Sequence, residues 1–198
     1  AYYRDNLQTW EMQALTRLRF AGGDQALGKA FLEMIEGFIY RRGLTPAQVE
    51  DIRAMRPRMT REKVSLAQKG SHVKLDAGGL VDVEFAVQFA QLHWGWKFPG
   101  FRHGGVLQIL EQADAARLLG GETVRALREG YLFLRAIENK IRMVSGLSLE
   151  TIPQDQQAQL SLVRRLGFHK PEDFWRKYRA ATAAVRKAFD AVCAKALS

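Results

Sequence analysis

The sequence has little cysteine and little proline: one cysteine, Cys193, and five prolines among 198 residues. A single cysteine excludes an internal disulfide and a zinc site built from thiolates, and it is typical of proteins of the reducing cytoplasm. The longest uncharged apolar stretch, residues 85–96, is too short to span a bilayer and includes two glutamines and a histidine. The sequence therefore predicts a cytoplasmic protein that has no membrane-spanning segment.

Metal-binding and catalytic motifs are also absent. The four histidines, His72, His93, His103 and His169, never lie three or four residues apart on one predicted helix, so we expect no metal site. The sequence lacks the G-x-S-x-G, Walker and G-x-G-x-x-G motifs of hydrolases and nucleotide-binding folds. These absences leave no recognisable catalytic centre.

Positive charge is in excess, with 30 lysines and arginines against 21 aspartates and glutamates and a net charge of +9. A basic protein attracts polyanions, so nucleic acid and the phosphates of a nucleotide are candidate partners. A basic domain with solvated faces has the same composition without any such partner. We expect only weak, nonspecific binding to nucleic acid.

Apolar residues recur at helical spacing along almost the whole chain, which predicts an all-α protein. With 47% hydrophobic residues the chain can bury a core, and we expect one bundle of seven or eight helices over residues 1–198. Residues 68–79 are predicted to form a loop with a short extended piece at 72–75. We expect helices from near Tyr3 to Gly22, from Leu27 to Ile39, from Thr45, from near Leu80, from Val106 to Leu119, after Gly121, from Asp155 to Leu166, and from Pro171.

Local signals define some helix ends more sharply. In the sequence TPAQ, Thr45 and Gln48 can form a capping box around a proline suited to the first turn. Within that helix Pro57 should produce a kink, because its ring removes a hydrogen bond. We expect Gly43 to end the preceding helix in the left-handed conformation.

The stretch KLDAGGLVDVEF, residues 74–85, places two glycines ahead of an apolar helix that carries two carboxylates. Asp82 lies in the first turn, where exposed amides favour an anion. Glu84 lies about 200° further round the helix, so the two cannot hold one metal ion from the same face. Asp76 has no second carboxylate beside it, because Gly78 occupies that place, and the paired metal ligands of phosphoryl transfer are missing.

Two interpretations of this stretch remain open. In the first, Gly78 and Gly79 permit a tight turn, Asp82 caps the helix, and Glu84 pairs with an arginine inside the bundle. In the second, Lys74 and the amides around the two glycines attract a phosphate, which Asp82 or Glu84 orients indirectly.

Two other groups receive structural interpretations. Arg135, Glu138 and Arg142 follow one stripe at spacings that allow ion pairs. Trp10 follows the helical apolar period, so we expect it in the core rather than as a platform for a nucleotide base.

Three motifs, in this order and spacing, resemble the glutamine synthetase adenylyltransferase family: Thr9 to Asp24, Val73 to Phe89, and Tyr131 to Arg142. Members of that family are long bacterial enzymes with two similar halves, each a nucleotidyltransferase domain followed by a helical domain. The resemblance implies that one half adenylylates a tyrosine of glutamine synthetase with ATP and Mg²⁺. It implies that the other half removes the AMP by phosphorolysis, under the control of PII-type signal proteins and glutamine.

This chain resembles only the helical domain, since the family's G-S-x-x-D-x-D signature is absent and would lie upstream of Ala1. The start at alanine is also typical of a piece of a longer protein. The resemblance implies that the fragment alone is inactive and contributes no catalytic residue. The motif TWE-QAL-R-R resembles the transferase half, whereas FIYRRGLTP resembles the other half, and we favour the transferase half. The matched positions imply nucleotide-facing roles for Arg17, Arg19, Lys74, Asp76, Gly78, Gly79, Asp82 and Glu84.

A rival hypothesis needs no nucleotide. In it the helical bundle docks glutamine synthetase or a PII-type protein through its basic face, and the glycine motif is purely architectural.

Overall fold

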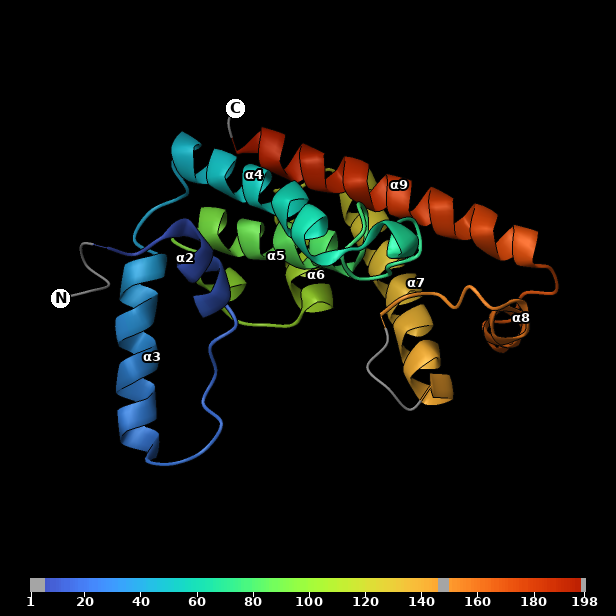
Figure 1. The fold of residues 1–198 in the computed structure, drawn as a ribbon. Helices are drawn as coiled ribbons and strands as arrows, with labels where there is room; N and C mark the ends of the chain where they lie inside the picture. Colours follow the sequence, from blue (N-terminus) through green and yellow to red (C-terminus); the bar gives the residue numbers. More distant parts are fainter. Residues whose placement is uncertain (1–5, 146–149, 197–198) are drawn as a thin grey trace.

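The structure is a computed structural model that describes residues 6–145 and 150–196. Within these residues it contains eight α-helices, two short 3-10 helices and no strand, which confirms the predicted all-α class (Figure 1). One isolated bridge pairs His72 with Thr151, at the start of the expected extended piece. The elements are α2 (Thr9–Leu15), α3 (Gln25–Ile39), α4 (Pro46–Lys63), η1 (Leu66–Gln68), α5 (Leu80–Trp94), η2 (Pro99–Arg102), α6 (Val106–Ala115), α7 (Gly121–Ser145), α8 (Gln156–Arg165) and α9 (Pro171–Lys195).

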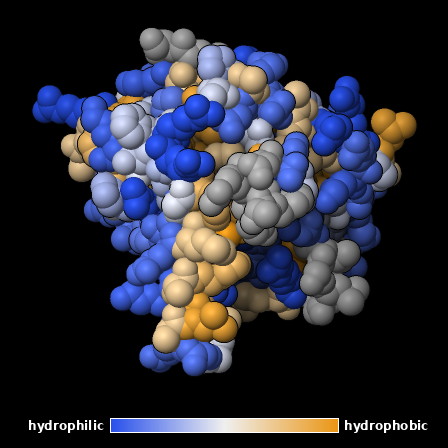
Figure 2. All heavy atoms as spheres, turned by 90° about the vertical axis from the view of Figure 1, so that its left-hand side faces the viewer, coloured by the Kyte–Doolittle hydropathy of each residue, from blue (hydrophilic) through white to orange (hydrophobic). Residues whose placement is uncertain are grey.

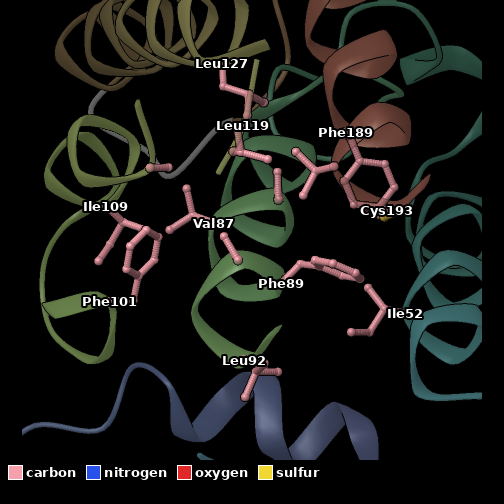
Figure 3. Packing of buried hydrophobic residues seen from close by; sticks show 14 of the residues in the cluster. Ile52, Val87, Phe89, Leu92, Phe101, Ile109, Leu119, Leu127, Phe189 and Cys193 are labelled. Carbon is pink, nitrogen blue, oxygen red and sulfur yellow. The ribbon is translucent and has the colours of Figure 1, made fainter. Parts of the chain in front are cut away.

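Helix α5 is central, as its apolar sequence predicts, because it is buried on nearly all sides and has no solvent-facing stripe. Helices α2, α6, α7 and α9 contact it, and α4 shares its apolar core (Figure 1). In the core, Ile52 of α4 and Phe189 of α9 point toward Phe89 of α5 (Figure 3). This helix therefore fixes the positions of its own polar side chains, including Asp82 in the first turn and Glu84.

A second apolar cluster lies between α7, α8 and α9. It includes Leu80, from the stretch at residues 74–85 that we call the glycine motif, and the preceding residue Val73, so this motif is part of the packing between α5 and the second cluster. Helices α7 and α9 approach closely because Gly130 has no side chain. A Cβ atom at Gly130 would lie 2.2 Å from Cγ2 of Val185. The close packing of α7 against α9 therefore depends on this glycine.

The local capping signals are partly confirmed. The amide of Thr45 donates to Oε1 of Gln48 at 2.9 Å, and the amide of Gln48 donates to Oγ1 of Thr45 at 3.3 Å, which completes the capping box. Helix α4 then continues through Pro57 to its last residue. Helix α3 ends at Ile39, as predicted, but its C-cap is Tyr40, and Gly43 does not adopt the left-handed conformation. Gly43 serves close packing, since a Cβ atom there would lie 3.0 Å from the carbonyl oxygen of His93.

The first predicted helix is shorter than its apolar period suggested. A capping box between Gln8 and Glu11 begins α2 at Thr9, and the helix stops before Arg17. Leu18, which would have extended the apolar stripe, remains 38% exposed, so no burial favours further helix there. The expectation for Trp10 was wrong, because its side chain is 56% exposed. Tyr3 lies outside the described residues.

Cys193 lies on the face of α9 that packs against the core and is fully buried, and this burial raises the pKa of its thiol to about 12. Because the thiolate is the reactive species, we expect no maleimide labelling of the native chain at pH 7.5 over a period in which the urea-unfolded chain reacts completely. Mass spectrometry of the two samples checks this. Complete labelling of the native protein would show that α9 opens locally.

None of the described helices combines the length and the hydropathy that a membrane span requires.

Candidate functional site

The two glycines form a close-packed turn at the start of α5. Gly78 has a φ of +76°, in the left-handed region that favours glycine, and a Cβ atom there would lie 1.8 Å from the carbonyl oxygen of Thr182 in α9. Gly79 is equally confined, since its Cβ would lie 2.7 Å from the carbonyl oxygens of Val73 and Lys74. The turn therefore needs glycine for steric reasons alone.

The backbone amides of this turn are all bonded within the chain. The amide of Gly78 donates to Oδ2 of Asp82 at 2.6 Å, and the amide of Gly79 donates to the carbonyl of Asp76 at 2.9 Å. The amide of Leu80 donates to the carbonyl of Val73 at 3.0 Å. Gly78 and Gly79 are also buried. A phosphate would have to displace these bonds, so the structure favours the tight-turn interpretation over direct phosphate binding by the amides.

Asp82 is fully buried and forms an ion pair with Arg56 of α4, which is 1% exposed. Burial raises the pKa of Asp82, and the neighbouring guanidinium of Arg56 opposes this rise. Arg56 also donates to the carbonyl oxygens of Leu75 and Asp76, at 3.0 and 2.9 Å. The pair thus fastens α4, α5 and the glycine motif together, and it places the side chain of Asp82 in the interior of the domain.

Sequence reasoning missed Arg56. The signal was present, because Arg56 lies seven residues after Val49 and four after Ile52, on the face of α4 that is buried. An arginine on an apolar stripe predicts a buried acidic partner, but the sequence does not say which carboxylate supplies it.

Asp76 and Lys74 also have partners within the domain. The carboxylate of Asp76 accepts a hydrogen bond from the backbone amide of His72 at 2.8 Å, and the Asp76 residue is buried. Nζ of Lys74 lies 3.0 Å from Oε1 of Glu150, and the Lys74 side chain is 37% exposed. Lys74 therefore stays near solvent, whereas Asp76 is a structural residue of the turn.

Glu84 joins a chain of ion pairs that crosses from the segment after α2 to α7. One oxygen, Oε1, lies 3.2 Å from Arg17 and 2.9 Å from Arg135. Arg135 also contacts Glu138, at 2.5 Å, and Glu138 contacts Arg142 at 3.0 Å. The predicted pairing of Glu84 with an arginine and the ion-pair stripe on α7 are both confirmed. Because Glu84 and Glu138 are largely buried, they hold the arginines in fixed positions.

Arg17, Arg19 and Glu84 come together at a cleft of about 700 Å³ beside the middle of α5. Arg102, from η2, reaches the same cleft and donates from Nε to the carbonyl of Gly95 at 2.9 Å. The lining thus includes three arginines and one carboxylate, Glu84, and Arg102 also pairs with Glu36 at 3.5 Å. This excess of positive charge makes the cleft suited to an anion. The cleft is lined by Thr16, Arg17, Leu18, Arg19, Glu84, Val87, Gln88, Gln91, Arg102, His103, Gly104, Gly105, Val106 and Tyr131.

The structure therefore divides the eight predicted site residues into three groups. Arg17, Arg19 and Glu84 share the cleft, and Lys74 lies elsewhere, at a partly exposed position. The others are buried in the packing of the turn, which joins α5 to α9. These are Asp76, Gly78, Gly79 and Asp82. Among the described residues, no group of three histidine, cysteine, aspartate or glutamate side chains could hold a metal ion.

Comparisons with known proteins match the chain to one family and to long enzymes. A family model described as GlnD PII-uridylyltransferase matches residues 48–193. A bifunctional glutamine synthetase adenylyltransferase/adenylyl-removing enzyme of Streptomyces avermitilis is 37% identical over 96% of the chain. Enzymes of the same name from Mesorhizobium japonicum and Xanthobacter autotrophicus are 31% and 34% identical over 96% and 87% of the chain.

The chain spans only about a fifth of the length of these relatives, between 18% and 20%. The family model covers the glycine motif and the ion pairs of α7, whereas Arg17 and Arg19 of the cleft lie before its first residue. This chain therefore belongs to the family that the GlnD PII-uridylyltransferase model describes, and its predicted resemblance to glutamine synthetase adenylyltransferases is confirmed over 96% of its length.

Proposed function

We propose that this chain is the helical domain of a bacterial glutamine synthetase adenylyltransferase and that its cationic cleft forms one wall of the nucleotide site of an adjoining nucleotidyltransferase domain. The observation that carries the proposal is the meeting of Arg17, Arg19 and Arg102 in one cleft. Guanidinium groups bind phosphate oxygens through two parallel hydrogen bonds, which suits them to the triphosphate of ATP.

The described residues do not fit a magnesium site, since they bring no three acidic or histidine side chains together. The carboxylates that hold Mg²⁺ against the phosphates would then come from the adjoining domain. This chain would bind and orient the nucleotide, and we expect the purified chain alone to transfer no AMP.

The ion pairs around the cleft support a positioning role. Glu84 holds Arg17 and Arg135 at once, and Glu138 holds Arg135 from the other side. Arginines fixed in this way need little reorganisation when negative charge develops on a transferring phosphoryl group. The frame of α5 and α7 therefore keeps the cationic wall in place during the reaction.

The proposal extends to the partners named by the relatives. Glutamine synthetase would be the protein substrate, in the cytoplasm, and a PII-type signal protein would regulate the parent enzyme. In the alternative, the basic surface docks glutamine synthetase or the PII-type protein and the cleft has no role at the nucleotide. The net charge of +9 favours this alternative as well, so the two need a direct test.

The test combines Arg17→Ala with Arg19→Ala in the longer enzyme. Loss of a charge-assisted hydrogen bond costs about 1.5–3 kcal/mol, so we expect KM for ATP to rise about tenfold to a hundredfold. Binding of glutamine synthetase, measured by surface plasmon resonance, should not change. Lys74→Ala in the same assay tests the remaining exposed cation among the predicted site residues.

The matched control is Arg176→Ala, which removes an exposed arginine of α9 that does not line the cleft. It should leave both measurements unchanged. Weaker binding of glutamine synthetase, with normal turnover at saturating partner, would instead establish the docking alternative. An unchanged KM in the double variant would contradict the proposed role of the cleft.

A further inference from the structure

Helix α3 exposes a row of large apolar side chains. Leu27, Phe31 and Met34 recur at spacings of four and three residues, so they form one stripe along the helix. They are 72%, 43% and 46% exposed, respectively. Only the last turns of the helix are anchored, through Ile35 and Ile39, which are buried. We call the stripe of Leu27, Phe31 and Met34 the outer face of α3.

The surface around the outer face of α3 is apolar too. Helix α3 lies at one side of the molecule (Figure 1), and the view onto that side shows a column of apolar residues running down it (Figure 2). Leu18 and Phe20, just before the helix, are 38% and 41% exposed. A contiguous apolar surface of this kind is unusual on an isolated domain and is typical of an interface.

The Lys29–Glu33 ion pair of α3 lies away from the outer face. Lys29 and Glu33 pair with each other, at 3.8 Å, and so contribute no net charge. They lie about 160° from Phe31 around the helix, away from the outer face. An apolar surface packed against the outer face would therefore bury no unpaired charge from these two residues.

Two observations locate that partner. The family model begins at residue 48, so α2 and α3 lie on the amino-terminal side of the matched helical domain. The relatives match α3 as well, yet this chain spans only about a fifth of their length, so they contain much more protein that could cover this helix. Arg17 and Arg19 lie on the segment between α2 and α3. A partner that covers α3 would consequently lie next to the cationic cleft.

We propose that the outer face of α3 packs against an apolar surface of the nucleotidyltransferase domain that precedes this chain in the parent polypeptide. The inference rests on the proposed function, because it needs that domain to be present. It adds the contact that would bring the two domains together. Docking of α3 would place the connected segment, with Arg17 and Arg19, beside that domain.

Cysteine labelling tests the contact without measuring activity. Met34→Cys places a thiol on the outer face, and the native Cys193 is buried and gives no background. The control is Met143→Cys on α7, where Met143 is 73% exposed. Maleimide labelling of each variant is followed by peptide mass spectrometry, in this chain alone and in the longer polypeptide.

We expect the introduced thiol of the Met34→Cys variant to react at least tenfold more slowly in the longer polypeptide than in this chain, while the control thiol reacts equally in both. Equal rates for Met34→Cys in the two proteins would overturn the inference. Protection in the short chain that grows with its concentration would also overturn it, because a second copy would then cover α3. The proposed nucleotide role would fail separately, through an unchanged KM in the arginine variants.

Discussion

Arg56→Met is expected to lower the free energy of unfolding by about 3–5 kcal/mol, because it leaves Asp82 as a buried carboxylate without its main partner. Asp82 would retain only the amide of Gly78 and the guanidinium of Arg186, which lies 3.6 Å away. The loss should also release the carbonyl oxygens that Arg56 binds in the glycine motif. Urea denaturation followed by circular dichroism measures the change.

An exposed arginine on the same helix provides the control. Arg58 is 64% exposed and pairs with Glu62 at 3.8 Å, so Arg58→Met should cost less than about 1 kcal/mol. The double variant Arg56→Met with Asp82→Leu removes both charges and should recover most of the lost stability. Equal losses for Arg56→Met and Arg58→Met would show that the buried pair does not hold α4 against α5.

Gly78→Ala is expected to destabilise the fold by about 2–5 kcal/mol. An alanine in the left-handed region costs about 1–2 kcal/mol, and forcing a methyl group into a packed region costs about 1–3 kcal/mol more. The methyl group would meet the backbone of Thr182 at 1.8 Å, so α9 itself would have to move. Thermal and urea unfolding of the variant check the prediction.

Gly70→Ala separates the two costs. Gly70 has a φ of +84°, but nothing lies within 4 Å of the position that its methyl group would take, so only the conformational cost of about 1–2 kcal/mol applies. If Gly78→Ala were no more destabilising than Gly70→Ala, the close contact between the turn and α9 would be disproved.

Helix class and most helix positions followed from the sequence because they depend on neighbouring residues. The capping box of Thr45 and Gln48 acts over three residues, and the apolar composition of α5 places it in the centre whatever surrounds it. The errors arose where distant packing decides. Gly43 is a glycine because of His93, and Trp10 is exposed although it follows the apolar period.

The candidate site was predicted only in part. The motifs identified Arg17, Arg19 and Glu84, and the structure brings these three into one cleft. The same motifs also selected Gly78 and Asp82, which resemble a phosphate-binding turn in sequence. Their hydrogen bonds and their burial between α4, α5 and α9 favour a role in holding the domain together.

The sequence by itself determined the helical class, the family and the set of residues worth examining, because periodicity, caps and motifs are local properties of the chain. Only the tertiary structure decided which charges are available to a ligand. Arg56 and Arg17 look alike in sequence, yet packing buries the first against Asp82 and leaves the second half-exposed at the cleft. The availability of a charge depends on which distant carboxylates and helices surround it, and the fold alone brings those together.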